Sequence, residues 1–300
     1  MLRAPVRASV RTLAFRRPGL RLLNVVHRRL SAAARRRFFH LCYDERWRVS
    51  GRWTVDFAGR HIVLPLSHEF PDAWLAAVGF HGYDPEVHAL YETLVLGPRP
   101  PRVVFDVGAS YGLHALRFLV HGVRVVAFEP NPECHRWFRA WCAANGVACE
   151  LEPVAVGDAA TPVVLAFPEG RTYLGSIVSQ TRDAWRGATV RTLTVPQVTL
   201  DSVLAERCLV PDLVKIDAEG AEIAVLHGAV NLLRTAQPTI VFEAWHDVDV
   251  RRQLWTIFAD HGYAVAAIDG SIPRRLTVTG FADARVTNFV AETPPGHVIK

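Results

Sequence analysis

The segment VVFDVGASYG, residues 103–112, runs from an apolar stretch into a glycine-containing turn, and a helical pattern follows. The apolar stretch is typical of a buried strand in a parallel sheet. Glycines in the turn allow tight reversal and let a ligand approach the backbone without a Cβ atom in the way. Ligands of such sheets bind beyond the carboxyl ends of the strands. The segment therefore predicts ligand contacts at Asp106, Gly108, Ser110 and Gly112.

A second apolar run, residues 124–128, is followed directly by Glu129. An acid at this position can accept hydrogen bonds from both ribose hydroxyls of an adenosine. A nicotinamide dinucleotide site would show G-x-G-x-x-G, with a pyrophosphate at the helix N-terminus. Here the spacing is D-x-G-x-x-x-G, and a carboxylate beside the turn favours a cation and repels a pyrophosphate. We therefore expect S-adenosylmethionine, which carries an ammonium and a sulfonium and no phosphate.

Strand and helix patterns alternate through the rest of the chain. We expect strands at 102–107, 124–128, 150–156, 213–216 and 239–242, and helices at about 112–120, 133–144, 201–208, 220–234 and 249–261. This alternation predicts an α/β Rossmann-like fold with a mostly parallel central sheet. Two last runs, 263–268 and 286–291, have no strong helix between them, so we expect an antiparallel C-terminal edge hairpin.

The organisation before this domain is less regular. Residues 1–43 contain eleven arginines and no acidic residue, whereas the rest of the chain carries 23 basic and 29 acidic residues. We expect a poorly ordered basic arm over residues 1–43, a small hairpin-containing segment over 44–84 and an S-adenosylmethionine-binding domain over 85–300. A transit peptide, a nucleic-acid-binding arm and a membrane-surface helix are the functional alternatives for the arm.

Composition excludes several classes. Half of the residues are hydrophobic and 21% are charged, which is globular composition. No apolar run approaches the roughly 20 residues that a spanning helix needs, so a transmembrane protein is excluded. The five cysteines form no C-x-x-C pair. This argues for reduced thiols in the cytoplasm, against a disulfide framework and against a zinc ribbon.

The segment DLVKIDAEGAE, residues 212–222, followed by VLHGA at 225–229, resembles the FkbM-type S-adenosylmethionine-dependent methyltransferases. Supporting matches lie at 106–109, 128–130, 155–158 and 199–201, and the resemblance covers about residues 85–290. It implies a Rossmann-like methyltransferase domain that methylates a hydroxyl of a sugar, glycolipid or secondary metabolite. It also implies that Asp158 holds the adenine amino group.

The acceptor side is expected at the ends of the fourth and fifth strands. Asp217 and Glu219 come next to where the methyl group should lie, although acids in a first helical turn also stabilise the helix dipole. Lys215, inside an apolar strand, should pair with Asp106 or Asp217. Glu243 and, beyond it, His246 are candidates to orient a hydroxyl and take its proton.

The candidate catalytic residues are therefore Asp217, Glu219, Glu243 and His246. The candidate cofactor-binding residues are Asp106, Gly108, Ser110, Gly112, Glu129 and Asp158. Asp217 and Glu219 lack a clear third ligand, so we predict no metal site.

These observations predict a cytoplasmic O-methyltransferase acting on a small-molecule or glycoside hydroxyl, with peripheral contact at the inner membrane surface through the basic arm. One alternative is an RNA methyltransferase that uses the arginines for phosphates. Against it, no Asn/Asp-Pro-Pro-aromatic loop follows the fourth strand and the body is acidic. The other alternative is a non-catalytic, membrane-associated scaffold that binds the cofactor.

Overall fold

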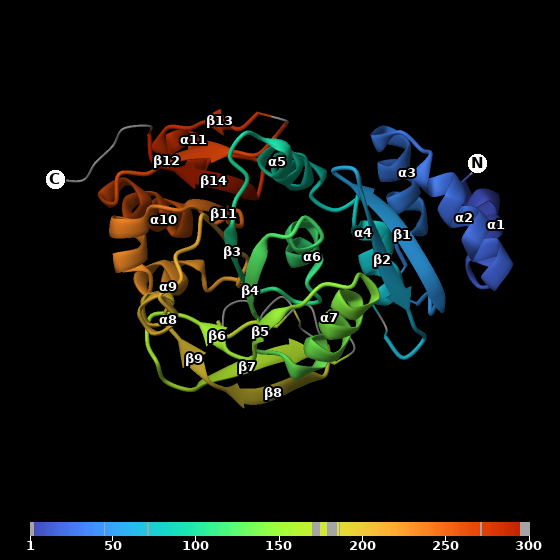
Figure 1. Cartoon of the computed structure of the whole chain (residues 1–300), viewed down its shortest axis with the longest axis horizontal. Helices are drawn as coiled ribbons and strands as arrows, with labels where there is room; N and C mark the ends of the chain where they lie inside the picture. Colours follow the sequence, from blue (N-terminus) through green and yellow to red (C-terminus); the bar gives the residue numbers. More distant parts are fainter. Residues whose placement is uncertain are drawn as a thin grey trace.

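The computed structural model describes residues 3–44, 46–70, 72–169, 175–178, 185, 187–270 and 272–294. Its centre is an eight-stranded sheet of order β13-β12-β14-β11-β10-β3-β4-β5 (Figure 1). Five neighbouring strands are parallel: β3 (Val103–Val107), β4 (Arg124–Phe128), β5 (Glu150–Glu152), β10 (Leu213–Ile216) and β11 (Thr239–Glu243). The expected Rossmann-like fold with a mostly parallel sheet is confirmed.

Helices cover both faces of this sheet, because successive strand side chains point to opposite sides. Val104 packs in one core with α5 (Pro85–Leu96), α6 (Leu113–Leu119) and α7 (Pro132–Ala144). Phe105 packs in the other with α8 (Leu200–Arg207), α9 (Glu222–His227) and α10 (Val248–Asp260). The two cores leave the carboxyl ends of the parallel strands at one common edge.

The C-terminal strands form the predicted antiparallel pair. β12 (Ala264–Ala267) and β14 (Asn288–Glu292) pair antiparallel. β14 lies between β12 and β11 and is antiparallel to both. The edge is the short β13 (Arg274–Arg275), which α11 (Val278–Ala282) follows. Inserting β14 brings Asn288 opposite Glu243, at the site edge of the sheet.

Two other predicted elements are divided. The strand expected at 150–156 splits into β5 and β6 (Ala155–Val156) around Pro153, which has no N–H for a ladder; β6 pairs with β9 (Gln197–Val198) instead. The helix expected at 220–234 ends at His227, and a short π-helical turn, Leu232–Ala236, follows. The antiparallel pair β7 (Val163–Pro168) and β8 (Val190–Val195) was not predicted.

The prediction of a poorly ordered arm is wrong for the described residues, which form α1 (Arg3–Ala14), α2 (Arg17–Arg28) and α3 (Ala32–Cys42). Leu20, Leu23 and His27 recur at helical spacing on α2 and are buried. A Cβ atom on Gly19 would lie 2.6 Å from the carbonyl oxygen of Leu13, so this glycine lets α1 and α2 pack closely. None of the described helices is both long and apolar enough to cross a membrane.

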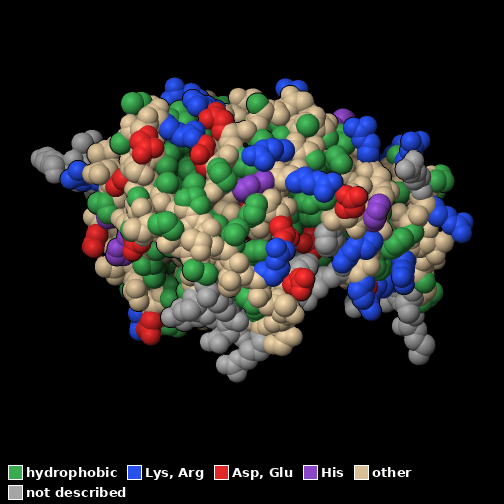
Figure 2. Space-filling view, turned by 90° about the horizontal axis from the view of Figure 1, so that it is seen from below, with side chains coloured by type: hydrophobic (Ala, Val, Ile, Leu, Met, Phe, Trp, Pro, Cys, Tyr) green, Lys and Arg blue, Asp and Glu red, His purple; other side chains and the backbone are tan. Residues whose placement is uncertain are grey.

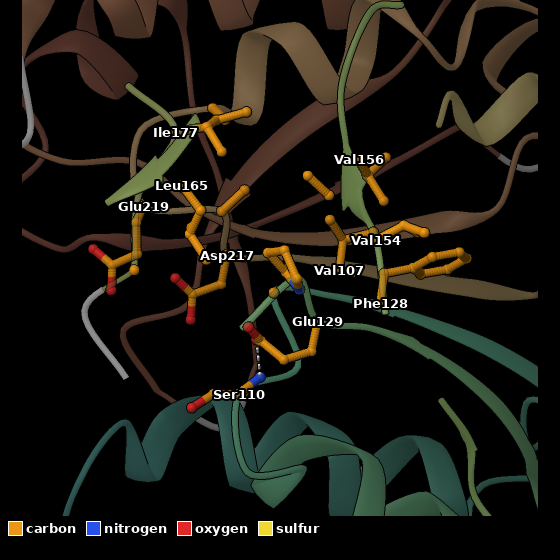
Figure 3. A pocket seen from close by; sticks show the side chains of 16 residues that line it. Val107, Ser110, Phe128, Glu129, Val154, Val156, Leu165, Ile177, Asp217 and Glu219 are labelled. Atoms are coloured by element: carbon orange, nitrogen blue, oxygen red, sulfur yellow. Dashed lines mark hydrogen bonds between the residues drawn. The ribbon is translucent and has the colours of Figure 1, made fainter. Parts of the chain in front are cut away.

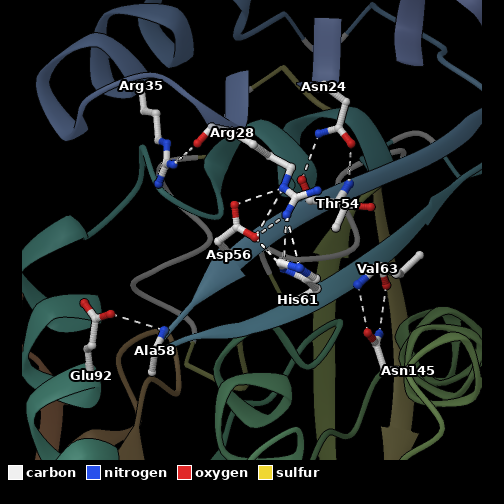
Figure 4. A network of polar contacts seen from close by, with 10 residues as sticks. All are labelled: Asn24, Arg28, Arg35, Thr54, Asp56, Ala58, His61, Val63, Glu92 and Asn145. Atoms are coloured by element: carbon white, nitrogen blue, oxygen red, sulfur yellow. Dashed lines mark hydrogen bonds and ion pairs between the residues drawn. The ribbon is translucent and has the colours of Figure 1, made fainter. Parts of the chain in front are cut away.

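A two-stranded ribbon joins these helices to the α/β domain. β1 (Gly51–Phe57) and β2 (Arg60–Leu66) form the predicted hairpin, in which Thr54 pairs with Val63. The Asn24 side chain, from α2, bonds the N–H of Thr54 at 2.9 Å and its carbonyl at 2.8 Å. The Asn145 side chain, after α7, bonds the N–H of Val63 at 2.7 Å and its carbonyl at 2.8 Å (Figure 4). Both open edges of the ribbon are thus closed at one register.

A short helix and a charged contact complete this junction. α4 (Ala73–Gly79) is almost wholly buried between the ribbon and α3. The Arg28 guanidinium donates to both oxygens of Asp56, at 2.9 and 2.7 Å, and this hydrogen bonding holds the pKa of Asp56 below its usual value. The arm is therefore anchored by polar contacts as well as by its apolar stripe.

We predict that Asn24→Ala and Asn145→Ala each destabilise the protein. Each change leaves a backbone donor and acceptor of the ribbon without a partner, at a cost of about 1–3 kcal/mol per buried group. Urea unfolding of the full chain measures the loss. Asn231→Ala, at an exposed position, is the matched control and should stay within about 0.5 kcal/mol of wild type. An unchanged free energy of unfolding in both Asn24→Ala and Asn145→Ala would show that these two side chains do not stabilise the edges of the ribbon.

Candidate functional site

A cavity that is partly open to solvent lies at the carboxyl ends of β3, β4 and β10. Glu129, Asp217 and Glu219 are the charged residues among its described lining, and no arginine or lysine lines it. Figure 3 shows Asp217 and Glu219 on one side of the cavity and the apolar side chains of Val154, Val156 and Phe128 on the other.

Gly108 brings two loops of the site into direct contact. Its φ is +73°, and a Cβ atom there would lie 1.8 Å from the carbonyl oxygen of Asp217. Only glycine fits this approach. Gly112 has a different role, because a Cβ atom there would lie 2.2 Å from the Phe138 ring. Gly108 lines the cavity, whereas Gly112 allows α6 to pack on α7 and does not line it.

Glu129 lies at the end of β4 and is only 7% exposed. Its carboxyl oxygens accept hydrogen bonds from the backbone N–H groups of Ser110 and Asn131, both at 2.7 Å. Burial raises the pKa of Glu129 to about 7, although these two hydrogen bonds oppose the shift. Ser110 adopts a left-handed backbone conformation with φ +50°, a strain that folds retain most often at functional sites. Each carboxyl oxygen keeps a lone pair for a ligand in the cavity.

Lys215 is buried between two carboxylates. Its Nζ lies 3.1 Å from Oδ2 of Asp217 and 3.7 Å from Oδ1 of Asp106. Burial alone would lower the pKa of Lys215, but Asp217 and Asp106 outweigh it and raise the pKa. The predicted pairing thus involves both acids. Asp106 is 1% exposed and does not line the cavity, so its contact with the site runs through Lys215.

Further carboxyl groups adjoin Asp217. Burial, then the charge of Asp217, raises the pKa of Glu219 to about 8. The same two causes raise the pKa of Glu243 to about 9, and a hydrogen bond joins Glu243 to Asp217. Asp84, which precedes α5, has a pKa raised to about 6, first by burial, and its side chain bonds Asn288. One acidic cluster is thus formed at this edge of the sheet by Asp217, Glu219, Glu243 and Asp84. Asn288 of β14 adjoins it through its hydrogen bond to Asp84.

Two predicted residues lie away from the cavity. Asp158 is exposed and does not line it, so its contact with adenine stays a prediction without geometric support. His246 is exposed, and its Nδ1 lies 3.4 Å from Nη2 of Arg251. Among the described residues, no group of three or more His, Cys, Asp or Glu side chains is arranged to hold a metal ion.

Three residues of the site were missed by sequence reasoning. Asp84 stands before Pro85 and looks like an ordinary helix start, and Asn288 is one polar residue in a strand. The Oγ of Ser176 donates to the backbone carbonyl of Glu219 at 2.7 Å. The glycine–serine pair at 175–176 was a weak sequence signal for Ser176. Asp84 and Asn288 reach the site only through long-range packing, which no local sequence pattern indicates.

The charges of the site fit S-adenosylmethionine. A cavity lined by three acids and no described basic residue attracts an ammonium and a sulfonium and would repel a pyrophosphate. The buried Glu129 carboxyl suits ribose hydroxyls, and the apolar side around Phe128 suits a purine ring. The residues present therefore match the cofactor expected from the glycine loop.

Comparisons with known proteins agree. The family model described as Methyltransferase FkbM domain matches residues 106–265. The 31-O-demethyl-FK506 methyltransferase FkbM of Streptomyces tacrolimicus is 31% identical over 198 residues, which are 56% of this chain and 75% of that protein. S-adenosylmethionine is therefore the cofactor of this methyltransferase domain.

Solved structures are more distant. Methyltransferase FkbM from Methylobacillus flagellatus KT is 16% identical, with a TM-score of 0.43 over 74% of this chain; the chain spans about half of that protein, 54%. A SAM-dependent methyltransferase from Agrobacterium tumefaciens is 11% identical, with a TM-score of 0.42 over 83% of this chain and 72% of its own length.

We predict that Glu129→Ala weakens S-adenosylmethionine binding roughly 10–150-fold, because two ribose hydroxyls lose a charged acceptor worth about 1.5–3 kcal/mol. Calorimetry on the folded variant measures the affinity. Asp158→Ala is the companion variant, and from its exposed position it should change affinity less than about twofold. Wild-type affinity in Glu129→Ala would refute the ribose assignment, and a large loss in Asp158→Ala would restore the adenine contact.

Proposed function

We propose that this chain, which belongs to the FkbM methyltransferase family, transfers a methyl group to a hydroxyl of a sugar, a glycolipid or a secondary metabolite. The observation that carries the proposal is the cluster of carboxyl groups centred on Asp217, at the wall of the cavity opposite its apolar side. Carboxyl groups bind hydroxyls and accept their protons. The relative from Streptomyces tacrolimicus is itself named for methylation at an oxygen.

Cofactor binding is assigned to the loops after β3 and β4. We propose that Glu129 binds the ribose and that Gly108 and Ser110 form the wall against which the cofactor lies. Asp106 acts by pairing with Lys215. Gly112 acts by leaving room for the Phe138 ring beside the loop. When bound, S-adenosylmethionine supplies an electrophilic methyl group on a sulfonium ion. The cavity brings this group and the acceptor into line, which supplies most of the acceleration.

Acceptor activation is assigned to Asp217. In this proposal its carboxylate accepts a hydrogen bond from the acceptor hydroxyl and takes the proton as transfer proceeds. Lys215, at 3.1 Å, fixes its orientation, and Glu243 donates a hydrogen bond to it, since a pKa of about 9 keeps Glu243 protonated at neutral pH. Glu219 lines the cavity beside them and is the alternative base. His246 is exposed and does not line the cavity, so it has no role in the proposal.

One methyl-transfer assay distinguishes hydroxyl methylation from RNA methylation and from a non-catalytic scaffold. Transfer of labelled methyl is measured from S-adenosylmethionine to 31-O-demethyl-FK506, to methyl glycosides, to lipid extracts and to RNA. We expect labelled ether products in the first three groups only. Labelling of RNA alone would establish the RNA alternative, and tight cofactor binding with no transfer to any acceptor would favour a non-catalytic scaffold.

For Asp217→Asn we predict a fall in kcat of about 10²–10⁴-fold, with cofactor affinity within a few-fold of wild type. Turnover, affinity and Tm are measured on the same preparation. His246→Gln, a change outside the cavity, is the control and should turn over normally. If Asp217 serves only to pair Lys215, turnover would persist while Tm falls, because a buried ammonium loses a partner.

We also propose that the protein acts in the cytoplasm and contacts the inner membrane surface through the outer side of α2. Leu22, Val25 and Val26 are 58, 45 and 49% exposed and recur at the spacing that places side chains on one helix side. The exposed Arg21 and Arg29 flank them. The opposite side of α2 is already buried against β1, so this second apolar stripe has no internal function.

Charge supports an anionic bilayer as the partner of this stripe. Residues 1–43 carry no acidic residue, and Figure 2 shows Arg side chains gathered over the N-terminal helices at the right of the view. Exposed apolar side chains framed by arginines are typical of helices that lie in the interface of anionic membranes.

The full chain should therefore float with vesicles of mixed anionic and zwitterionic lipid and not with purely zwitterionic ones. Leu22→Gln/Val26→Gln and Arg21→Gln/Arg29→Gln should each weaken binding by roughly tenfold or more, and salt should weaken it further. Ile272→Gln and Arg275→Gln, at exposed positions, are the matched controls. Equal loss in the controls, or binding of RNA but not of vesicles, would overturn the proposal.

A further inference from the structure

Two of the five cysteines lie together at the C-terminal end of α7. Cys142 is in the last turn of this helix, and Cys149 follows the turn at Gly146, whose φ is +65°. The N–H groups of Asn145 and Val147 both donate to the carbonyl of Cys142 at 3.1 Å, which folds the chain back on itself. As a result the two thiols share a hydrogen bond. Both are free thiols in the structure.

The surroundings of the two thiols differ. Cys142 is 2% exposed and packs in the core, whereas Cys149 is partly exposed at the edge of the same core. The hydrogen bond from Cys142 and the charge of Arg139 lower the pKa of Cys149, against partial burial. The same hydrogen bond, together with burial, raises the pKa of Cys142. Because Cys149 is the partly exposed thiol and Cys142 is buried, Cys149 is the thiol of the pair that an oxidant reaches first.

The other cysteines differ from Cys149 in their burial and surroundings. Cys42 is fully buried, and burial raises its pKa to about 12. Cys134 is buried. Cys208 is exposed and donates to the carbonyl of Ala205 at 3.8 Å. A thiolate that is reachable from solvent and has a second thiol in contact is therefore found at Cys149.

We propose that Cys149 and Cys142 form a redox modification site, in which Cys149 reacts with a hydroperoxide and Cys142 resolves the product as a reversible disulfide. The inference is independent of the proposed methyl transfer. It is compatible with the expected reduced thiols. In a reducing compartment the two cysteines are reduced, and they form a disulfide only when an oxidant is present.

The chemistry balances with hydrogen peroxide as the oxidant. The Cys149 thiolate attacks one peroxide oxygen, the O–O bond breaks, and the leaving hydroxide takes a proton to become water. The resulting sulfenic acid is attacked by the Cys142 sulfur, which loses its proton as the S–S bond forms and a second water leaves. Two thiols are oxidised and one peroxide is reduced to two waters. A dithiol reductant reverses the step by thiol–disulfide exchange.

The proposed disulfide encloses a structural contact. The ring from 142 to 149 contains Asn145, whose side chain clamps the edge of β2 at Val63. β5 begins directly after it at Glu150, and the carbonyl of Glu152 accepts from the N–H of Glu129 at 3.0 Å. Oxidation would therefore fix the turn that links the ribbon, the sheet edge and the strand end carrying Glu129.

The test treats the native full chain with stoichiometric hydrogen peroxide, then blocks free thiols and maps peptides by mass spectrometry. We expect a Cys142–Cys149 linked peptide, two mass units lighter than the reduced pair, forming roughly tenfold or more faster than any change at Cys208. Dithiothreitol should restore both thiols. Cys208→Ser is the matched control and should form the disulfide at the wild-type rate.

Variants of the pair separate the two roles. In Cys142→Ala, Cys149 should stop at sulfenic acid and be trapped by dimedone, whereas Cys149→Ser should leave Cys142 unmodified. If Cys142→Ala does not fold, the dimedone-trapped fraction of wild type at short times gives the same information. Oxidation of Cys208 before Cys149, or equal reaction of all cysteines, would overturn the proposal.

Discussion

The buried ammonium of Lys215 is the constraint on which the site depends. An unpaired ammonium inside an apolar sheet is costly. Lys215 therefore needs carboxylates within ion-pair distance of its Nζ atom. The parallel register of β3 and β10 places Asp106 directly opposite Lys215, and Asp217 follows two residues later. Two carboxylates for one cation satisfy the core and leave negative charge at the cavity. The contact that stabilises the sheet therefore also places Asp217.

That negative charge explains the protonation of the neighbouring acids. The pKa values of Glu219 and Glu243, about 8 and 9, lie above their usual value of 4.5. Between pH 4.5 and about 9 the folded protein thus holds more protons than the unfolded chain. Its stability should therefore fall as the pH rises through this range. A cation in the cavity has the opposite effect on Glu219, which lines it, because it favours the ionised carboxylate. The charge of the site therefore suits a positively charged cofactor.

The part of the cavity proposed to hold the cofactor could be located from sequence because its pattern is local. A strand, a glycine turn and a strand-end acid fix Gly108, Ser110 and Glu129 within a single βαβ unit. The acceptor half depends on packing that no local pattern records. Asn288 reaches the site because β14 is inserted beside β11, and Asp84 because α5 packs against the sheet. The packing of the N-terminal helices was not predicted for another reason: arginine-rich, acid-free composition favoured a poorly ordered arm over the helix that a short apolar stripe on α2 also allowed.

The ribbon of β1 and β2 gives these N-terminal helices a fixed relation to the site. One edge of the ribbon is held by Asn24 of the basic arm and the other by Asn145 of the α/β domain, at the paired residues Thr54 and Val63. An isolated two-stranded ribbon is marginally stable, so β1 and β2 depend on the contacts along both of their edges. The basic surface of α2 is thus rigidly joined to the domain that holds the acidic cavity.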